Sequence, residues 1–103
     1  MDQQGADSNF SAAAQADGDH VTVNVTGEVD MATADTMYAA ATPSGAARLT
    51  LDLRAVTFFD SAAIHALVRL GALYADALTV LPSPQVRRVL DISGLGDQPW
   101  LAD

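Results

Sequence analysis

The sequence predicts an α/β domain built on a mixed sheet, and three observations lead to that class. Segments in which every second residue is apolar alternate with segments of helical apolar spacing. An early Asp-Gly-Asp turn indicates a hairpin, which is antiparallel, whereas strands separated by helices pair in parallel. The length of 103 residues, half of them apolar, suits a single domain over residues 10–103, with residues 1–9 forming a polar, disordered tail.

The opening hairpin consists of two expected strands. The apolar pattern over 10–16 is weak and favours a strand at the edge of a sheet. The turn over 17–19 leads into a strand over 21–26, where valines alternate with polar residues and give one buried face. The stretch 27–30 ends that strand.

A helix and a second core strand follow. The alanine-rich stretch 32–42 predicts the helix, with Asp30 as its candidate N-cap and a Pro-Ser-Gly turn after its end. Leucines then alternate with polar residues over 49–53, and Val56 and Phe58 follow shortly. This pattern predicts a strand that crosses the core.

The C-terminal part predicts a longer helix after Ser61, a buried strand over 77–81 and a last helix. The last helix has Ser83 as its N-cap and Pro84 at its first position, and a Gly-containing turn ends it. Residues 98–101 are expected to add a short strand, which makes about four or five strands in all. The expected inner faces are Ile64, Leu67, Val68 and Gly71 for the first helix, and Val86, Val89 and Leu90 for the second.

Composition excludes several functions. Thirteen acidic against five basic residues give a net charge of −8, which disfavours binding to nucleic acid or to an anionic membrane. The chain has no cysteine, so disulfides, thiol nucleophiles and Cys-ligated metals are ruled out. We see no signal peptide and no apolar run long enough to cross a bilayer, and therefore expect a cytoplasmic protein.

Catalytic, metal and cofactor motifs are also lacking. Ser61 and His65 are spaced to touch on a helix, but no Gly-x-Ser-x-Gly elbow accompanies them, and Asp60 is better placed to cap the helix than to orient His65. The acids from Asp17 to Glu28 have the length of a calcium loop, yet a Val-x-Val strand occupies its centre. There is no lysine for a phosphate-binding loop. We therefore expect no enzyme activity, no cofactor and no metal.

The pair Asp60-Ser61 is the remaining candidate. A serine between a strand and a helix is most often an N-cap, which is the ordinary interpretation of Ser61. The alternative is a modifiable hydroxyl near the surface beside a carboxylate. A phosphate there would be attracted by the positive helix end and repelled by Asp60.

Three stretches together resemble a STAS domain of the anti-sigma factor antagonist type. They are the strand with Gly-Glu-Val-Asp over 23–30, the strand and Asp-Ser junction over 49–61, and the last helix with its exit over 83–95. The resemblance runs from about residue 10 to the end of the chain. It implies a small mixed sheet of about four to five strands with helices packed on one face.

The resemblance also implies a function, which is regulation of bacterial transcription, including stress responses, by partner switching. The unphosphorylated protein would bind an anti-sigma factor that is also a serine kinase, and phosphorylation at Ser61 would end that binding. ATP would be bound by the kinase, and dimerisation of this chain stays open. The implied partner-binding residues are Glu28, Asp30, Asp60, Ser61, Ala62 and His65.

One departure from the family pattern keeps alternatives open. The family commonly has Asp-Ser-Ser-Gly at this junction, whereas Ala62 and Ala63 stand here in place of the second serine and the glycine. STAS domains also serve as non-catalytic subunits of lipid-asymmetry ABC transport complexes, which is the second hypothesis. The third, a small serine hydrolase, predicts ester turnover, which we do not expect.

Overall fold

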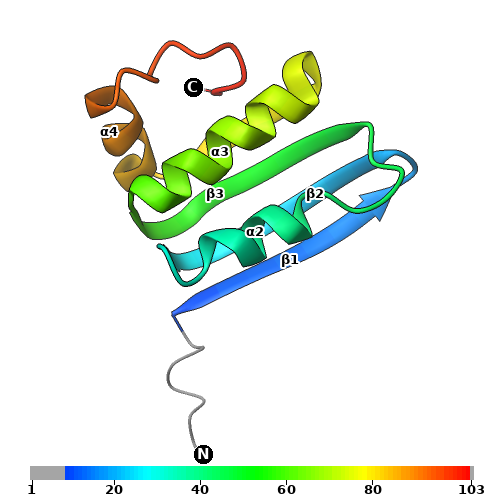
Figure 1. Ribbon diagram of the computed structural model, residues 1–103, viewed down its shortest axis with the longest axis horizontal. Helices are drawn as coiled ribbons and strands as arrows, with labels where there is room; N and C mark the ends of the chain where they lie inside the picture. Colours follow the sequence, from blue (N-terminus) through cyan, green and yellow to red (C-terminus); the bar gives the residue numbers. More distant parts are fainter. Residues whose placement is uncertain (1–8, 103) are drawn as a thin grey trace, which may run out of the picture.

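The structure is a computed structural model and describes residues 9–102 (Figure 1). Within that range the chain alternates strands and helices after an opening hairpin, as expected. The strands are β1 (Phe10–Asp17), β2 (His20–Val29), β3 (Arg48–Phe59) and β4 (Leu78–Pro82). The helices are α2 (Ala34–Ala40), α3 (Ser61–Tyr74), a short 3-10 turn over Ala75–Ala77 and α4 (Pro84–Ile92). The tail expected over residues 1–9 falls almost entirely outside the described residues.

The four strands form one mixed sheet in the order β1-β2-β3-β4. β1 is antiparallel to β2, while β2, β3 and β4 are parallel to their neighbours. Both parallel connections step in the same direction across the sheet, so right-handed crossovers place their helices on the same face. Figure 1 shows α2 and α3 on that face, and α4 packs against β3. The predicted mixed sheet with helices on one face is confirmed.

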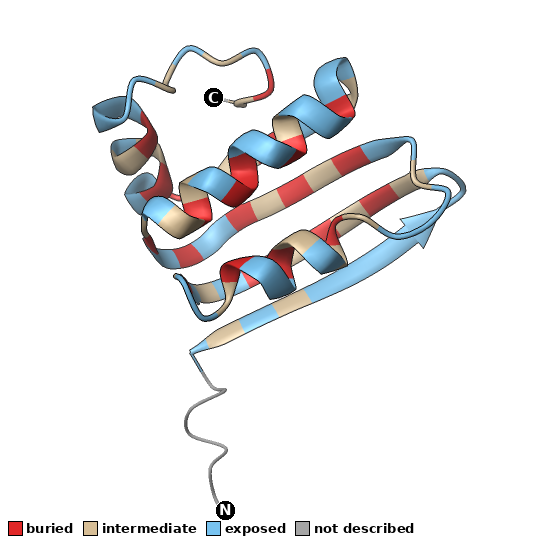
Figure 2. Cartoon of the chain, in the orientation of Figure 1, coloured by how far each residue is buried: buried red, intermediate tan, exposed pale blue. Residues whose placement is uncertain are grey.

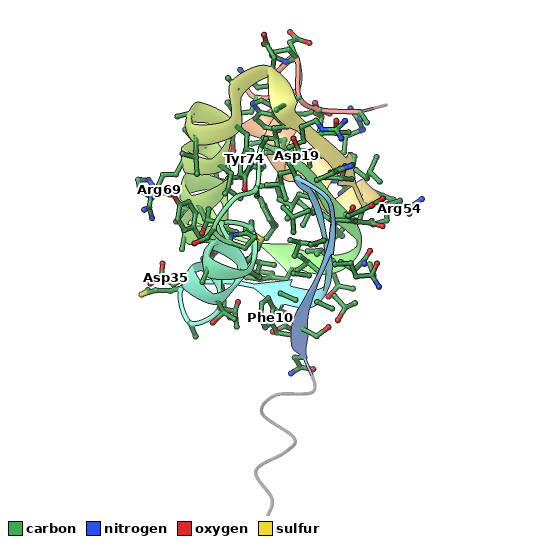
Figure 3. All side chains as sticks on the ribbon, turned by 90° about the vertical axis from the view of Figure 1, so that its right-hand side faces the viewer. Phe10, Asp19, Asp35, Arg54, Arg69 and Tyr74 are labelled. Atoms are coloured by element: carbon green, nitrogen blue, oxygen red, sulfur yellow. The ribbon has the colours of Figure 1, made fainter. Side chains whose placement is uncertain are left out.

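The apolar core lies between the sheet and these helices (Figure 2). Val23 of β2, Leu51 of β3 and Leu67 and Leu70 of α3 are all fully buried in it. Alternate residues of the strands point to the opposite, polar face of the sheet. In Figure 3, Arg54 of β3 extends on the side of the molecule opposite Arg69 of α3.

The hairpin confirms the expected edge strand and depends on two glycines. Gly18 takes a positive φ of 64° in the two-residue turn. Gly27 has a φ of 86°, and a Cβ at this position would lie 1.8 Å from the backbone oxygen of Asn9. Only glycine allows the start of β1 to approach β2 so closely.

The helix expected over 32–42 is shorter, and its predicted cap is wrong. α2 begins at Ala34, and Thr33 occupies the N-cap position without a side-chain capping bond. Asp30 instead closes a turn before the helix, because its Oδ1 accepts a hydrogen bond from the Ala32 backbone N–H at 2.9 Å. A carboxylate that bonds two residues ahead favours a turn over a helix start.

After Leu53 the alternation of buried and exposed residues in β3 shifts by one position. The prediction that Phe58 belongs to the core is therefore wrong. Val56 and Phe59 are buried, whereas Phe58 is 49% exposed. β3 has one extra residue relative to β2 at two points. The first lies between the pairs Asn24–Asp52 and Thr26–Ala55, and the second lies just before the pair Glu28–Phe58. Each such bulge shifts the alternation of faces by one residue.

The buried face of α3 is also displaced from the prediction. Leu67 is buried as expected, but Val68 is 46% exposed, and Ile64 and Gly71 are only partly covered. The residues that face the core have the same helical spacing, shifted by one position, and include two small alanines; they are Ala63, Ala66, Leu67, Leu70 and Tyr74.

The last part of the chain confirms the predicted capping and alters the final strand. The Ser83 hydroxyl accepts a hydrogen bond from the Val86 backbone N–H at 3.1 Å, and Pro84 opens α4. Val86 and Leu90 are buried, while Val89 is only partly buried. The strand expected over 98–101 is reduced to one isolated parallel bridge between Val80 and Leu101.

Candidate functional site

The candidate site lies where β2 and β3 end side by side. Val29 pairs with Phe59, and the Asp60 backbone N–H donates to the Val29 carbonyl at 3.2 Å. Asp30 and Asp60, the residues that follow these two strands, therefore emerge from the same edge of the sheet. The topology thus brings together carboxylates that are thirty positions apart in the sequence.

Asp60, not Ser61, caps α3. The Asp60 Oδ1 accepts a hydrogen bond from the Ala63 backbone N–H at 3.1 Å, and its extended backbone is that of an N-cap residue. Ser61 is the first residue of the helix and is exposed. No hydrogen bond of the Ser61 hydroxyl is present among the described residues. Its hydroxyl is thus free of the capping role that is the ordinary interpretation of such a serine.

A hydrogen-bonded turn holds the end of β2. The Thr33 hydroxyl lies 3.0 Å from the Glu28 carbonyl and 3.2 Å from Asp30 Oδ1, and it can donate to either. The same hydroxyl accepts from the Asp30 backbone N–H at 2.9 Å. Asp30 is half-buried in this turn. Its carboxylate is therefore held in place by the turn.

The other expected partner-binding residues differ in exposure. Glu28 and His65 are exposed, and His65 lies one helical turn after Ser61 on the same side of α3. Ala62 is half-buried against the core, and Ala63 beside it is fully buried. Glu28, Ser61 and His65 are consequently the exposed members of the set.

Two exposed apolar residues at this edge were not predicted. Met31 follows Asp30 and is 82% exposed, and Phe58, which pairs with Glu28 across the strands, is 49% exposed. The signal for Met31 was its place in the loop directly after a strand. The exposure of Phe58 could not be recognised beforehand, because strand alternation assigned this residue to the core.

The arrangement lacks the contacts of a nucleophilic triad. No hydrogen bond joins Ser61 to His65, and no described carboxylate bonds the His65 ring. Across residues 9–102 no group of three or more His, Asp or Glu side chains is arranged to hold a metal ion. None of the helices in that range is long and apolar enough to span a bilayer.

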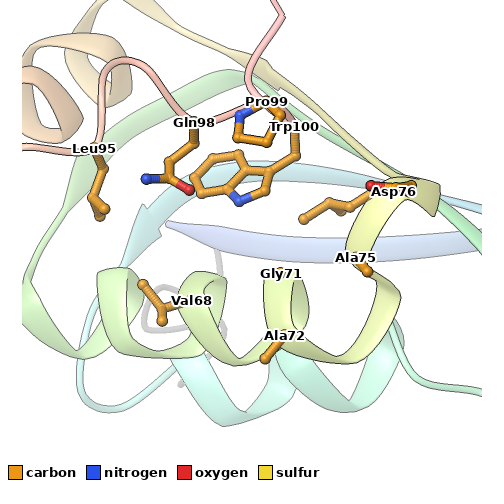
Figure 4. A pocket seen from close by; sticks show the side chains of 10 residues that line it. Val68, Gly71, Ala72, Ala75, Asp76, Leu95, Gln98, Pro99 and Trp100 are labelled. Atoms are coloured by element: carbon orange, nitrogen blue, oxygen red, sulfur yellow. The ribbon is translucent and has the colours of Figure 1, made fainter.

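A separate groove of about 520 Å³ lies between α3 and the C-terminal segment (Figure 4). Val68, Gly71 and Ala72 line it on the helix side, and Leu95, Gln98 and Trp100 on the other. Gly71 leaves room for the indole, since a Cβ there would lie 3.0 Å from Trp100 Nε1. Neither Ser61 nor any carboxylate of the strand ends takes part in this groove.

The fold and the site together define a small α/β domain that presents a capped helix start and two strand ends to solvent. The chain belongs to the STAS family described as "Mlab, STAS domain", whose model matches residues 12–102. This confirms the resemblance seen in the sequence. No curated protein sequence matches the chain.

Solved structures with the same fold include an anti-sigma factor antagonist from Mycobacterium paratuberculosis and two forms of the antagonist SpoIIAA. The antagonist from Mycobacterium paratuberculosis aligns with a TM-score of 0.77 and 24% sequence identity. The alignment covers 89% of this chain and 84% of that chain, and it shows that the two share a fold. SpoIIAA in its unphosphorylated form aligns at 0.67 and 28% identity, over 91% and 86% of the two chains. The phosphorylated form of SpoIIAA, a Bacillus cell fate determinant, aligns at 0.63 and 26% identity, over 91% and 89%.

Proposed function

We propose that this protein is an anti-sigma factor antagonist that binds an anti-sigma factor kinase and is switched off by phosphorylation at Ser61. The observation that carries the proposal is the exposed Ser61 at the start of α3, whose hydroxyl is released because Asp60 caps the helix. The likeness to SpoIIAA, solved in phosphorylated and unphosphorylated forms, supports it. Binding to the kinase would free the sigma factor for transcription.

The phosphoryl transfer needs nothing from this chain except the serine. The γ-phosphoryl of ATP held by the kinase bonds to Ser61 Oγ, the hydroxyl proton passes to a base on the kinase, and ADP leaves. The product carries about two negative charges at the helix start, where the backbone N–H groups stabilise an anion. The fold therefore tolerates the modification.

The consequence for binding comes from the carboxylates at the neighbouring strand ends. Asp30 and Asp60 are held there by their hydrogen bonds, and Glu28, two residues before Asp30, is exposed. A partner that accepts this acidic rim must offer basic or neutral polar groups. A phosphate at Ser61 lies next to Asp60 and must give up its hydration when the partner covers it, and both effects oppose binding.

Met31 supplies the apolar part of the proposed docking surface. It is 82% exposed and directly follows Asp30 at the end of β2, whereas Phe58 neighbours the buried Phe59 and points to the open face of the sheet, away from α3. Large apolar side chains at the centre of an interface usually provide most of the binding energy, while a charged rim fixes orientation. The expected partner surface is thus an apolar hollow with a basic border.

The test is calorimetric titration of the protein into an anti-sigma factor kinase from the same genome. Ser61→Asp should weaken binding by about tenfold or more, whereas Ser61→Ala should bind like the wild type. Ser44→Asp, in an exposed loop away from the strand ends, is the matched control and should leave binding unchanged. Wild-type affinity in Ser61→Asp would contradict the switch.

A second function is favoured by two observations. The matching family model is described as Mlab, and Ala62 replaces the second serine of the antagonist pattern. Under this hypothesis the chain is a non-catalytic subunit that docks on the ATPase of a lipid-asymmetry transporter and needs no phosphorylation. Affinity purification distinguishes the two, because it recovers an ABC ATPase in one case and a kinase in the other.

A further inference from the structure

The outer edge of β1 is a second surface, separate from Ser61. β1 is the eight-residue strand at one end of the sheet, and it pairs with β2 without a register shift. The Glu28 backbone N–H donates to the Asn9 carbonyl at 2.6 Å, so Asn9 faces β2. Because orientation alternates along a strand, the backbone groups of the even-numbered residues face away from β2; these residues are Phe10, Ala12, Ala14 and Ala16.

This edge has none of the features by which proteins usually protect an edge strand. Within the described residues no other segment pairs with it. β1 contains no proline, no lysine and no bulge, and Asp17 at its end is its only charged residue. Its last five residues, over 13–17, are all exposed. Among the described residues, a regular edge of this length with a single charge at its end is a template for another strand.

We infer that the occupant of this edge is a second copy of the chain, paired antiparallel through β1 about a two-fold axis at Ala13. In this register Ala12 lies opposite Ala14 of the second copy, and Phe10 opposite Ala16. All outward-facing groups are then bonded, in about eight inter-chain backbone hydrogen bonds. The two sheets become one continuous sheet.

The side chains of β1 suit this register. On the helix-covered face the one large residue, Phe10, meets the small Ala16, and on the open face Ser11 meets Gln15. Asp17 lies opposite the neutral Asn9 and not opposite another carboxylate, so no like charges are paired across the axis. The strand is therefore complementary to itself in size and in charge.

The two copies would run in opposite directions, which places their Ser61 sites at opposite ends of the joined sheet. The dimer is thus compatible with the proposed docking at Ser61 and does not depend on it. Each copy carries a net charge of −8, so repulsion opposes association, and added salt should strengthen the dimer.

Sedimentation equilibrium of the full chain from micromolar to millimolar concentration tests the proposal. We expect a monomer–dimer equilibrium whose dissociation constant falls as salt is added. Ala14→Pro removes an outward N–H that β2 does not use, and should raise the dissociation constant by about tenfold or more. Ala14→Val keeps the N–H and is the matched control, which should still dimerise.

Single cysteines test the register, because the wild-type chain has none. Ala13→Cys places two thiols directly opposite each other across the axis, within reach of a disulfide, and should form a covalent dimer on mild oxidation. Gln15→Cys, on the same face, puts its thiols more than about 10 Å apart and should not. A monomer at every concentration, dimerisation of Ala14→Pro equal to that of Ala14→Val, or equal cross-linking of the two cysteine variants would overturn the proposal.

Discussion

Replacement of Asp60 by alanine tests how the start of α3 is built. The substitution removes the acceptor of the Ala63 backbone N–H, a hydrogen bond of 3.1 Å, and leaves that donor without its protein partner. Loss of an N-cap side chain costs about 1 kcal/mol, within a range of about 0.5–2. Loss of a negative charge at a helix N-terminus adds about 0.3–1 kcal/mol. We therefore expect Asp60→Ala to lower the free energy of unfolding by about 1–2 kcal/mol.

Urea and thermal unfolding followed by far-UV circular dichroism measure this loss. For a domain of this size, each kcal/mol corresponds to a fall in Tm of about 4–8 °C. Asp60→Asn keeps an acceptor and loses the charge, so it should lose less than half as much as Asp60→Ala. Asp97→Ala, an exposed carboxylate in the C-terminal segment, is the control for a change in net charge. If Asp60→Ala unfolds at the same urea concentration as Asp97→Ala, Asp60 does not cap the helix and the free hydroxyl of Ser61 loses its explanation.

Two further predictions concern stability. The Tyr74 hydroxyl donates to the Ala41 carbonyl at 2.6 Å in a buried contact, so Tyr74→Phe should lower the unfolding free energy by about 1–3 kcal/mol in urea titrations. Burial, with a smaller effect of Tyr38, raises the pKa of Tyr74 above its ordinary 10.0. The unfolded chain therefore loses this proton first, and the free energy of unfolding of the wild type should fall as the pH rises above 10. Tyr74→Phe has no such proton and should not show this fall. Arg54 bonds Asp52 through Nε at 3.0 Å and Nη2 at 2.8 Å, and these bonds hold the pKa of Asp52 below its ordinary 3.8. The stability that these bonds contribute is fully present above pH 3.8 and is lost as the pH falls through the lowered pKa of Asp52. The urea midpoints of wild type and Arg54→Ala should therefore differ at neutral pH and converge in acid. A difference in midpoint that persists in strong acid would count against this ion pair.

Much of the fold was predictable because local signals agree with the global arrangement. The valine alternation of β2, the Asp-Gly-Asp turn and the Ser83-Pro84 helix start each indicate one structure and are found in it. The proximity of Asp30 and Asp60 also followed from the sequence, since each directly follows a strand and parallel strands end at the same edge of a sheet.

The errors arose where tertiary contacts decide the outcome. Two bulges in β3 cannot be recognised from alternation, and they place Phe59, not Phe58, in the core. In α3 the large residues Ile64 and Val68 suggested a buried face, yet the small Ala63 and Ala66 allow close packing on the sheet and face inward instead. Apolar spacing is insensitive to alanine, which suits either face of a helix.

The hydrogen-bonding roles at the candidate site were predicted in part. Asp60 was expected to cap α3 and does, whereas Asp30 was expected to cap a helix and instead closes a turn. Ser61, the other possible cap of α3, is its first residue. Competing acceptors for a helix N-terminus have similar energies, so only the backbone geometry decides which of two neighbours is used. The only signal for Met31 was its place in the loop directly after a strand, and its exposure became visible in the fold.

The most direct test of the central claim is to map phosphate by mass spectrometry after incubating the protein with an anti-sigma factor kinase and ATP. We expect one phosphate per chain, on Ser61, no phosphate on Ser61→Ala, and loss of kinase binding in step with modification. Unmodified Ser61 in a reaction where the kinase is active, or a phosphorylated Ser61 that still binds the kinase with unchanged affinity, would contradict it.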